Sequence, residues 1–142
     1  MPYPEYLIAP MRQELVEMGA RECRTVEDVD AAVKSPGVVM MIVNSVCGCA
    51  AAKARPGIGM ALEQGPKPDV VATVFAGADM AATDRARQYF APFPPSSPSV
   101  ALLRDGKLLY MMERRDIESR SAEMIADQLG LAFEKHCAPV TK

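Results

Sequence analysis

Continuous apolar runs alternate with helical patterns along this 142-residue chain. Residues 38–43 form an unbroken apolar stretch, and residues 70–75 form a second run rich in β-branched side chains. Runs of this kind are typical of strands that are covered on both faces. Residues 100–103 and 107–112 flank a turn that contains Asp-Gly at positions 105–106, which predicts a β-hairpin.

Helical periodicity or helix-capping residues mark the segments between these strands. Thr25 is predicted to cap the second helix, and either Asp79 or Thr83 the fourth. Pro56 lies inside the third helix and predicts a kink there. The predicted helices cover residues 4–18, about 25–34, about 49–64, from the 79–83 region to about 90, and about 117–135.

The order of these elements is helix, helix, strand, helix, strand, helix, strand, strand, helix. Two β-α-β crossings followed by a hairpin predict an α/β fold with a mixed central sheet and helices on both faces. This arrangement is thioredoxin-like. A single domain is expected over residues 1–142, with an N-terminal helical part (1–36), the sheet and its helices (37–136) and a polar tail (137–142) that frays.

Composition and charge narrow the classes of function. Hydrophobic residues make up 49% and charged residues 24%, and the formal net charge is −2, which provides no electrostatic basis for binding nucleic acid or an acidic membrane surface. The start of the chain lacks the pattern of a signal peptide, and no apolar stretch is long enough for a membrane span. We therefore expect a cytoplasmic protein, in which four cysteines act as thiols, metal ligands or catalytic groups.

The sequence Cys47-Gly48-Cys49 lies where the first apolar run ends and an alanine-rich helix begins. A thiolate near a helix N-terminus is stabilised by the macrodipole, which lowers its pKa. We interpret Gly48 as a residue whose missing Cβ allows a tight turn between the two sulfurs. The pattern predicts a redox site. Lys53 and Arg55 are expected on the solvated face of the helix, with a direct role as the alternative.

A family resemblance extends over nearly the whole chain. Residues 43–50, which contain Cys-Gly-Cys, together with 55–57 (Arg-Pro-Gly) and the proline-rich segment 94–99 before a strand, closely resemble the bacilliredoxins. These are thioredoxin-fold proteins with Cys-Gly-Cys in place of Cys-x-x-Cys. The resemblance implies thiol–disulfide exchange on proteins capped by bacillithiol, with Cys47 as the attacking thiolate and Cys49 as the second, resolving cysteine.

The same resemblance implies the surroundings of the reaction. No cofactor is expected to be tightly bound, bacillithiol acts as the co-substrate, and the partners are bacillithiol-capped client proteins and the reductase system of the small thiol. Pro98 matches a proline that is cis in thioredoxin-like folds, so the Ser97 backbone is expected to pair with an extended substrate segment. Asn44 and Gly48 are the other expected substrate-binding residues. Because the chain has no tryptophan, thiol activation is expected from the helix terminus and from the neighbourhood of Asn44 and Ser45.

Alternative functions and roles remain at this point. The protein could act as a disulfide isomerase or oxidant with the same Cys-Gly-Cys site. It could instead be a metal-binding module, in which Cys47, Cys49, His136 and Cys137 form a Cys₃His zinc site. Cys23 is expected to be structural. The segment that holds Arg114 and Arg115 is expected to be a solvated turn and helix start, with contact to the carboxylates of bacillithiol as the alternative.

Overall fold

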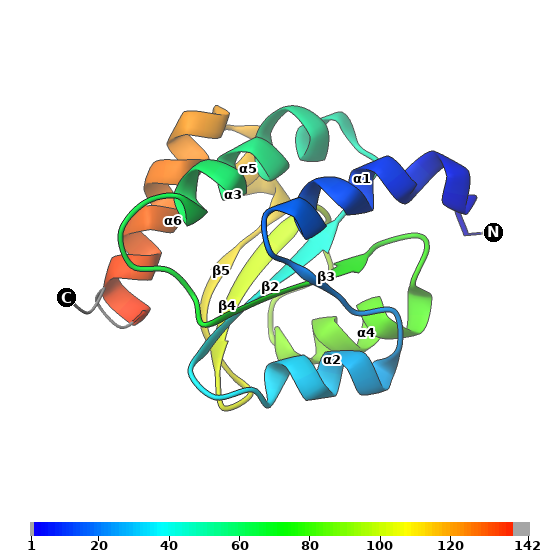
Figure 1. The fold of residues 1–142 in the computed structure, drawn as a ribbon, viewed down its shortest axis with the longest axis horizontal. Helices are drawn as coiled ribbons and strands as arrows, with labels where there is room; N and C mark the ends of the chain where they lie inside the picture. The colour runs from blue at the N-terminus through cyan, green and yellow to red at the C-terminus, as the bar shows by residue number, and fades with distance from the viewer. Residues whose placement is uncertain (1, 138–142) are drawn as a thin grey trace.

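A mixed five-stranded sheet forms the centre of the computed structural model, which describes residues 2–137. The strands stand in the order β1-β3-β2-β4-β5 (Figure 1). The first three are parallel, and β4 and β5 run antiparallel to the strands beside them. The strands are β1 (Arg21–Glu22), β2 (Val38–Asn44), β3 (Val70–Phe75), β4 (Ser99–Arg104) and β5 (Lys107–Met112).

Helices cover both faces of this sheet, as the sequence pattern predicted. In Figure 1, α3, α5 and α6 lie on one face together with α1, and α2 and α4 lie on the other. The helices are α1 (Glu5–Glu17), α2 (Val26–Val33), the π-helical segment η1 (Ala50–Ala54), α3 (Arg55–Leu62), α4 (Met80–Tyr89), α5 (Arg114–Glu118) and α6 (Ala122–His136).

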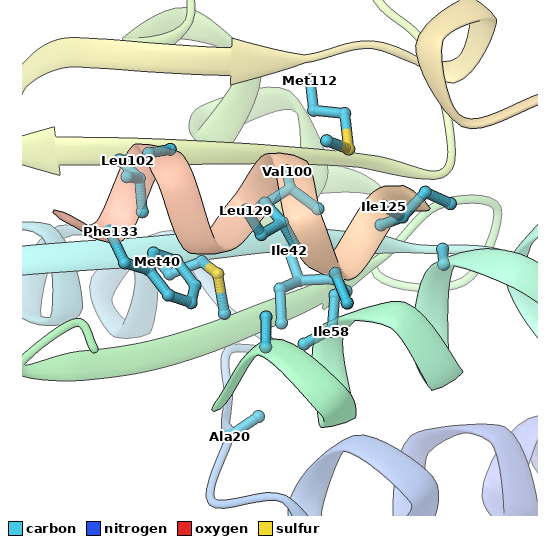
Figure 2. Packing of buried hydrophobic residues seen from close by; sticks show 14 of the residues in the cluster. Ala20, Met40, Ile42, Ile58, Val100, Leu102, Met112, Ile125, Leu129 and Phe133 are labelled. Carbon is cyan, nitrogen blue, oxygen red and sulfur yellow. The ribbon is translucent and has the colours of Figure 1, made fainter. Parts of the chain in front are cut away.

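All seven residues of β2 are buried, which explains its unbroken apolar sequence. Side chains alternate between the two faces along a strand. Met40 and Ile42 therefore pack with α3 and α6, whereas Met41 and Val43 pack with α2 and α4. Figure 2 shows the first cluster, whose members include Ile58, Val100, Leu102, Met112, Ile125, Leu129 and Phe133.

The connections between strands differ in part from the prediction. The crossing from β2 through α3 to β3 is parallel as expected. The link through α4 is not a parallel crossing, because β4 runs antiparallel to β2. The second β-α-β connection runs from β1 through α2 to β2, because both of these strands are parallel to β3. It was missed because β1 has two charged residues and no apolar run.

The predicted single helix over residues 117–135 is wrong. The chain forms α5 and then α6, and the break falls around Ser121. The Ser121 side chain accepts a hydrogen bond from the backbone N–H of Met124 at 3.2 Å and so caps the start of α6. A serine side chain that binds nearby backbone N–H groups favours a new helix start over helix continuation.

Two local predictions also need correction. Pro56 lies in the first turn of α3, which continues directly from η1, and the N–H of Arg55 just before it donates to the carbonyl of Ala50 across a π-helical turn. The irregularity expected as a proline kink is thus a π-helical segment before it. Asp79 precedes α4 but makes no capping bond, because its carboxylate binds Arg12 at 2.7 Å. Thr83 lies inside α4 and donates to the carbonyl of Phe75.

The remaining boundaries agree closely with the sequence pattern. Thr25 caps α2 in a reciprocal capping box with Asp28, and both residues of the β4–β5 turn have positive φ. Cys137 was expected in a frayed tail, but it is buried at the end of α6. The rest of the predicted tail, residues 138–142, lies outside the described residues. Within residues 2–137, no helix has the length and apolar character that a membrane span requires.

Candidate active site

The Cys-Gly-Cys segment joins the end of β2 to η1, the strand–turn–helix order that the sequence predicted. The carbonyl of Cys47 accepts the backbone N–H of Ala50 at 3.0 Å, so the helical turn begins at Cys47. Both Cys47 and Cys49 are partly exposed free thiols. The first cysteine therefore stands at a helix start where a reactant can reach its sulfur.

Hydrogen bonds at the helix start act on the thiol of Cys47. Its Sγ accepts the backbone N–H of Cys49 at 3.2 Å, and the N–H of Ala50, which donates to the Cys47 carbonyl, also acts to lower the pKa of the thiol. The N–H of Cys49 belongs to the first helical turn, where backbone N–H groups lack intrahelical acceptors. The Cys47 side chain thus occupies the place of a helix N-cap, where negative charge is favoured.

The two thiols differ in acidity. Partial burial acts to raise the pKa of Cys47, but hydrogen bonds from Ala50 and Cys49 outweigh it, and the pKa lies below its ordinary value. The positive charge of Arg114 acts in the same direction. For Cys49, burial and the neighbouring Cys47 sulfur both raise the pKa. Cys47 is therefore the more acidic thiol of the pair, and a larger fraction of Cys47 than of Cys49 is ionised at any given pH.

A buried polar network holds the turn that leads into the cysteines. The side-chain oxygen of Asn44 accepts the N–H of Ser45 at 2.9 Å and Nη1 of Arg55 at 2.9 Å, while its Nδ2 donates to the carbonyl of Met11 at 3.1 Å. Ser45 Oγ in turn accepts the N–H of Cys47 at 3.1 Å. The Asn44 amide is buried, and its oxygen accepts two hydrogen bonds and its nitrogen donates one inside the protein, so the expected contact with substrate stays a prediction.

Arg55 is buried, so the prediction that it lies on the solvated face of the helix is wrong. It is only 2% exposed, and its guanidinium also binds the carbonyl of Ser45 and the carboxylate of Glu14. A signal was present, because Arg55 lies three residues before the buried Ile58 and thus on the same helix face. Lys53 was also expected on the solvated face, and it is partly exposed there. Its Nζ donates to the carbonyl of Glu118 at 2.6 Å.

Gly48 is exposed, and a Cβ added there would meet no atom within 4 Å outside its chain neighbours Cys47 and Cys49. The interpretation that Gly48 relieves crowding between the sulfurs of these two neighbours stays a prediction. Because Gly48 has no positive φ, the backbone does not require glycine.

We expect the Gly48→Ala variant to fold with wild-type stability within about 0.5 kcal/mol, as substitutions at uncrowded surface positions do. Its Cys47 alkylation rate should stay within about twofold of the wild type, because the N–H group that binds the sulfur is unchanged. Urea unfolding and iodoacetamide kinetics measure the two quantities. A loss of stability above about 1 kcal/mol would restore a conformational role for Gly48.

The proline-rich segment reaches the same end of the sheet. Ser99 pairs with Val43 in the register of β4 and β2, so Ser97 and Pro98 lie beside the end of β2. The Ser97–Pro98 bond is cis, as the resemblance implied, and the Ala91–Pro92 bond is cis as well. The carbonyl of Ser97, expected to face substrate, accepts Nη1 of Arg114 at 3.3 Å.

Arg114 connects this segment to the cysteines. It begins α5, its Nε donates to Glu118 at 3.1 Å, and its charge lowers the pKa of Cys47 as described above. From the sequence, Arg114 was expected to be a surface cation or a ligand of bacillithiol. Its effect on Cys47 could not be inferred from local sequence because the two residues belong to distant parts of the chain.

The other cysteines do not join this site. Cys23 is fully buried, and burial raises the pKa of its thiol to about 11; burial likewise raises the pKa of Cys137 to about 11. Neither is poised as a nucleophile at neutral pH. The structure does not assemble the considered zinc ligands Cys47, Cys49, His136 and Cys137, and no group of three or more potential ligands occurs within residues 2–137.

The fold and the helix-start dithiol together define a class: a thioredoxin-fold thiol–disulfide oxidoreductase. Solved structures share the fold. A putative oxidoreductase with a thioredoxin fold superposes with a TM-score of 0.59 at 13% identity, over 76% of this chain and 93% of that one. A mutant thioredoxin from Halobacterium salinarum gives a TM-score of 0.57 at 16% identity, over 84% of this chain and 92% of that one.

Sequence comparisons define the family. A family model described as disulphide isomerase matches residues 3–137. A bacilliredoxin of Koribacter versatilis is 52% identical over 95% of this chain and 94% of its own length. Bacilliredoxins of Geobacillus kaustophilus (47%, covering 97% of both chains) and Staphylococcus aureus (43%, covering 95% and 93%) are also similar. The chain belongs to the bacilliredoxin family.

Proposed function

We propose that this protein removes bacillithiol, or a similar small thiol, from mixed disulfides on cytosolic proteins, with Cys47 as the attacking thiolate and Cys49 as the resolving thiol. The observation that carries the proposal is the asymmetry of the dithiol. The backbone N–H of Cys49 binds the Cys47 sulfur and the pKa of Cys47 is lowered, whereas the pKa of Cys49 is raised. An attacking thiolate and a protonated second thiol are the two species that the reaction needs.

In the first step, the Cys47 thiolate attacks the sulfur of the small thiol in the mixed disulfide. The client–small thiol S–S bond breaks, a bond between Cys47 and the small thiol forms, and the client leaves as a thiolate that takes up a proton. The client cysteine is thereby reduced. The N–H of Cys49 holds the Cys47 sulfur in place for attack, and the N–H of Ala50 binds the Cys47 carbonyl.

In the second step, Cys49 loses its proton and attacks the sulfur of Cys47. A Cys47–Cys49 disulfide forms and the small thiol leaves as a thiolate. Over both steps the dithiol loses two electrons and two protons, and the mixed disulfide becomes two thiols. A reductase system that uses the small thiol is expected to reduce the Cys47–Cys49 disulfide back to the dithiol. No tightly bound cofactor takes part in these steps.

Intact-mass spectrometry of the protein after brief exposure to a bacillithiol-capped client tests this proposal. The Cys49→Ser variant is expected to gain the mass of the cap and keep it, because its nucleophile is intact and its resolving thiol is missing. The wild type is expected to lose two hydrogen masses and carry no cap. The Cys47→Ser variant, the matched control, should take up no cap, with a transfer rate at least about 10³-fold lower, as for removal of a catalytic nucleophile.

A second function, disulfide isomerase or oxidant, is favoured by the description of the matching family model. The same variants distinguish it. An isomerase would reactivate a scrambled disulfide protein with no preference for bacillithiol, and Cys47→Ser would abolish that activity. If no variant accepts a cap while the wild type reshuffles protein disulfides, the isomerase function replaces the decapping proposal.

A further inference from the structure

A hollow of about 580 Å³ opens between the proline-rich segment and α5. One wall is residues 92–96, whose Phe93 is partly exposed, and the other consists of Glu113, Arg114, Arg115 and Glu118. We call it the proline hollow. Its volume lies in the range of small-molecule sites, which are about 300–1,000 Å³.

The proline hollow lies toward the end of the sheet where the Cys-Gly-Cys turn follows β2. Arg114, in one wall, donates to the carbonyl of Ser97, and its positive charge acts on both Cys47 and Cys49. Glu118, in the same wall, accepts a hydrogen bond from Lys53 of η1 through its carbonyl. At the other wall, Ser96 precedes the Ser97–Pro98 bond beside the end of β2. The hollow is thus on the side of Cys47 where Arg114 and the Ser97–Pro98 bond lie, although neither cysteine lines it.

The two guanidinium groups of the hollow differ in how many hydrogen bonds they already make within the protein. Arg114 is engaged twice, with Glu118 and with the carbonyl of Ser97. Arg115 is far more available: its side chain is 81% exposed, and among the described residues one of its nitrogens, Nη2, binds Glu113 at 3.2 Å. A guanidinium with unused N–H groups is suited to hold a carboxylate through two parallel hydrogen bonds.

We propose that the proline hollow holds the small-thiol half of the mixed disulfide, and that Arg115 binds a carboxylate of that thiol. This inference rests on the proposed function and adds its recognition site. The occupant is a carboxylate-bearing thiol of low molecular weight, because the hollow is of small-molecule size, lies at the cysteine end of the sheet and presents an exposed guanidinium. Arg115 touches the substrate, whereas Arg114 positions the Ser97 carbonyl and tunes the thiolate.

A comparison of two caps on one client protein tests this assignment. The client carries either bacillithiol, which bears carboxylates, or 2-mercaptoethanol, which is neutral. In the Arg115→Gln variant, transfer of bacillithiol to Cys47 is expected to slow by about tenfold, the typical effect of one lost charged hydrogen bond. Transfer of 2-mercaptoethanol should stay within about twofold, since the neutral cap lacks the carboxylate.

Arg24→Gln is the matched control. It removes the same charge from an arginine whose side chain is 48% exposed and which is not part of the hollow, so both caps should transfer at wild-type rates. If Arg115→Gln slows both caps equally, or slows neither, the assignment of Arg115 as a carboxylate contact is overturned. In either of those results the wild type still transfers a cap to Cys47, so the proposed function stands. Failure of the wild type to accept any cap would instead contradict the proposed function itself.

A measurement without transfer tests the hollow in either case. S-methyl bacillithiol cannot exchange, yet it should occupy the proline hollow and slow the alkylation of Cys47 by iodoacetamide. That protection is expected in the wild type and in Arg24→Gln, and it should be lost in Arg115→Gln. Absence of protection in the wild type at millimolar S-methyl bacillithiol would overturn the proposed site.

Discussion

Replacing Arg55 with methionine is expected to lower the free energy of unfolding by about 3 kcal/mol, the lower end of the cost of breaking a buried charged pair. Arg55 is buried, and its guanidinium binds Asn44, the carbonyl of Ser45 and the carboxylate of Glu14. Removing one member of such a pair costs about 3–5 kcal/mol when the partner stays buried and unpaired. Because the side chain of Glu14 is 47% exposed and can be rehydrated, we expect the lower end of that range.

The same variant should react more slowly at Cys47. Loss of Arg55 leaves the carbonyl of Ser45 without its donor, and Ser45 Oγ orients the N–H of Cys47. In a looser turn the N–H groups at the helix start stabilise the Cys47 thiolate less. The alkylation rate of Cys47 at neutral pH is therefore expected to fall several-fold.

Urea unfolding and iodoacetamide kinetics measure both effects. Arg24→Met is the matched control, because Arg24 lies in an exposed ion pair and its loss should cost about 0.5 kcal/mol or less. Equal midpoints for Arg55→Met and the wild type would show that the buried network does not stabilise the fold.

Replacing Gly57 with alanine is expected to destabilise the protein by about 2–3 kcal/mol, in the upper part of the usual range for overpacking. A Cβ at position 57 would lie 2.7 Å from Cγ2 of Ile125 and 2.9 Å from the carbonyl oxygen of Ala122. Both atoms belong to α6, which packs against α3, and Figure 2 shows Ile125 and Ile58 in the shared cluster. The two helices would have to move apart, because a close-packed interior has no free volume to accept the methyl group.

Gly130→Ala provides the matched comparison within α6. A Cβ at position 130 would meet nothing within 4 Å, so the usual helix preference of alanine applies and a gain of about 0.5–1 kcal/mol is expected. The two glycine-to-alanine variants should therefore shift the thermal midpoint in opposite directions. A gain at both positions would mean that the contact between α3 and α6 adjusts without cost.

Features set by short stretches of sequence were predicted well. The apolar run of β2 reflects burial on both faces of the sheet. The Asp-Gly turn reflects the positive φ angles that the β4–β5 hairpin requires. The place of Cys47 at the end of a buried strand and the start of a helical turn follows from the same kind of local pattern. Each of these depends on neighbours within a few residues, which the sequence displays directly.

Features set by contacts between distant segments were decided only by the tertiary structure. The sequence does not state that Arg55 meets Asn44 and Glu14 in the interior, or that the N-terminal part of the chain supplies acceptors to the cysteine turn through Met11. It likewise could not show that the charge of Arg114 acts on Cys47, since α5 and the cysteine turn come to the same end of the sheet only when the whole sheet is assembled. The cysteine motif and its strand–helix setting are thus written in the sequence, whereas the charges and hydrogen bonds around it arise when helices and loops converge at one end of the sheet.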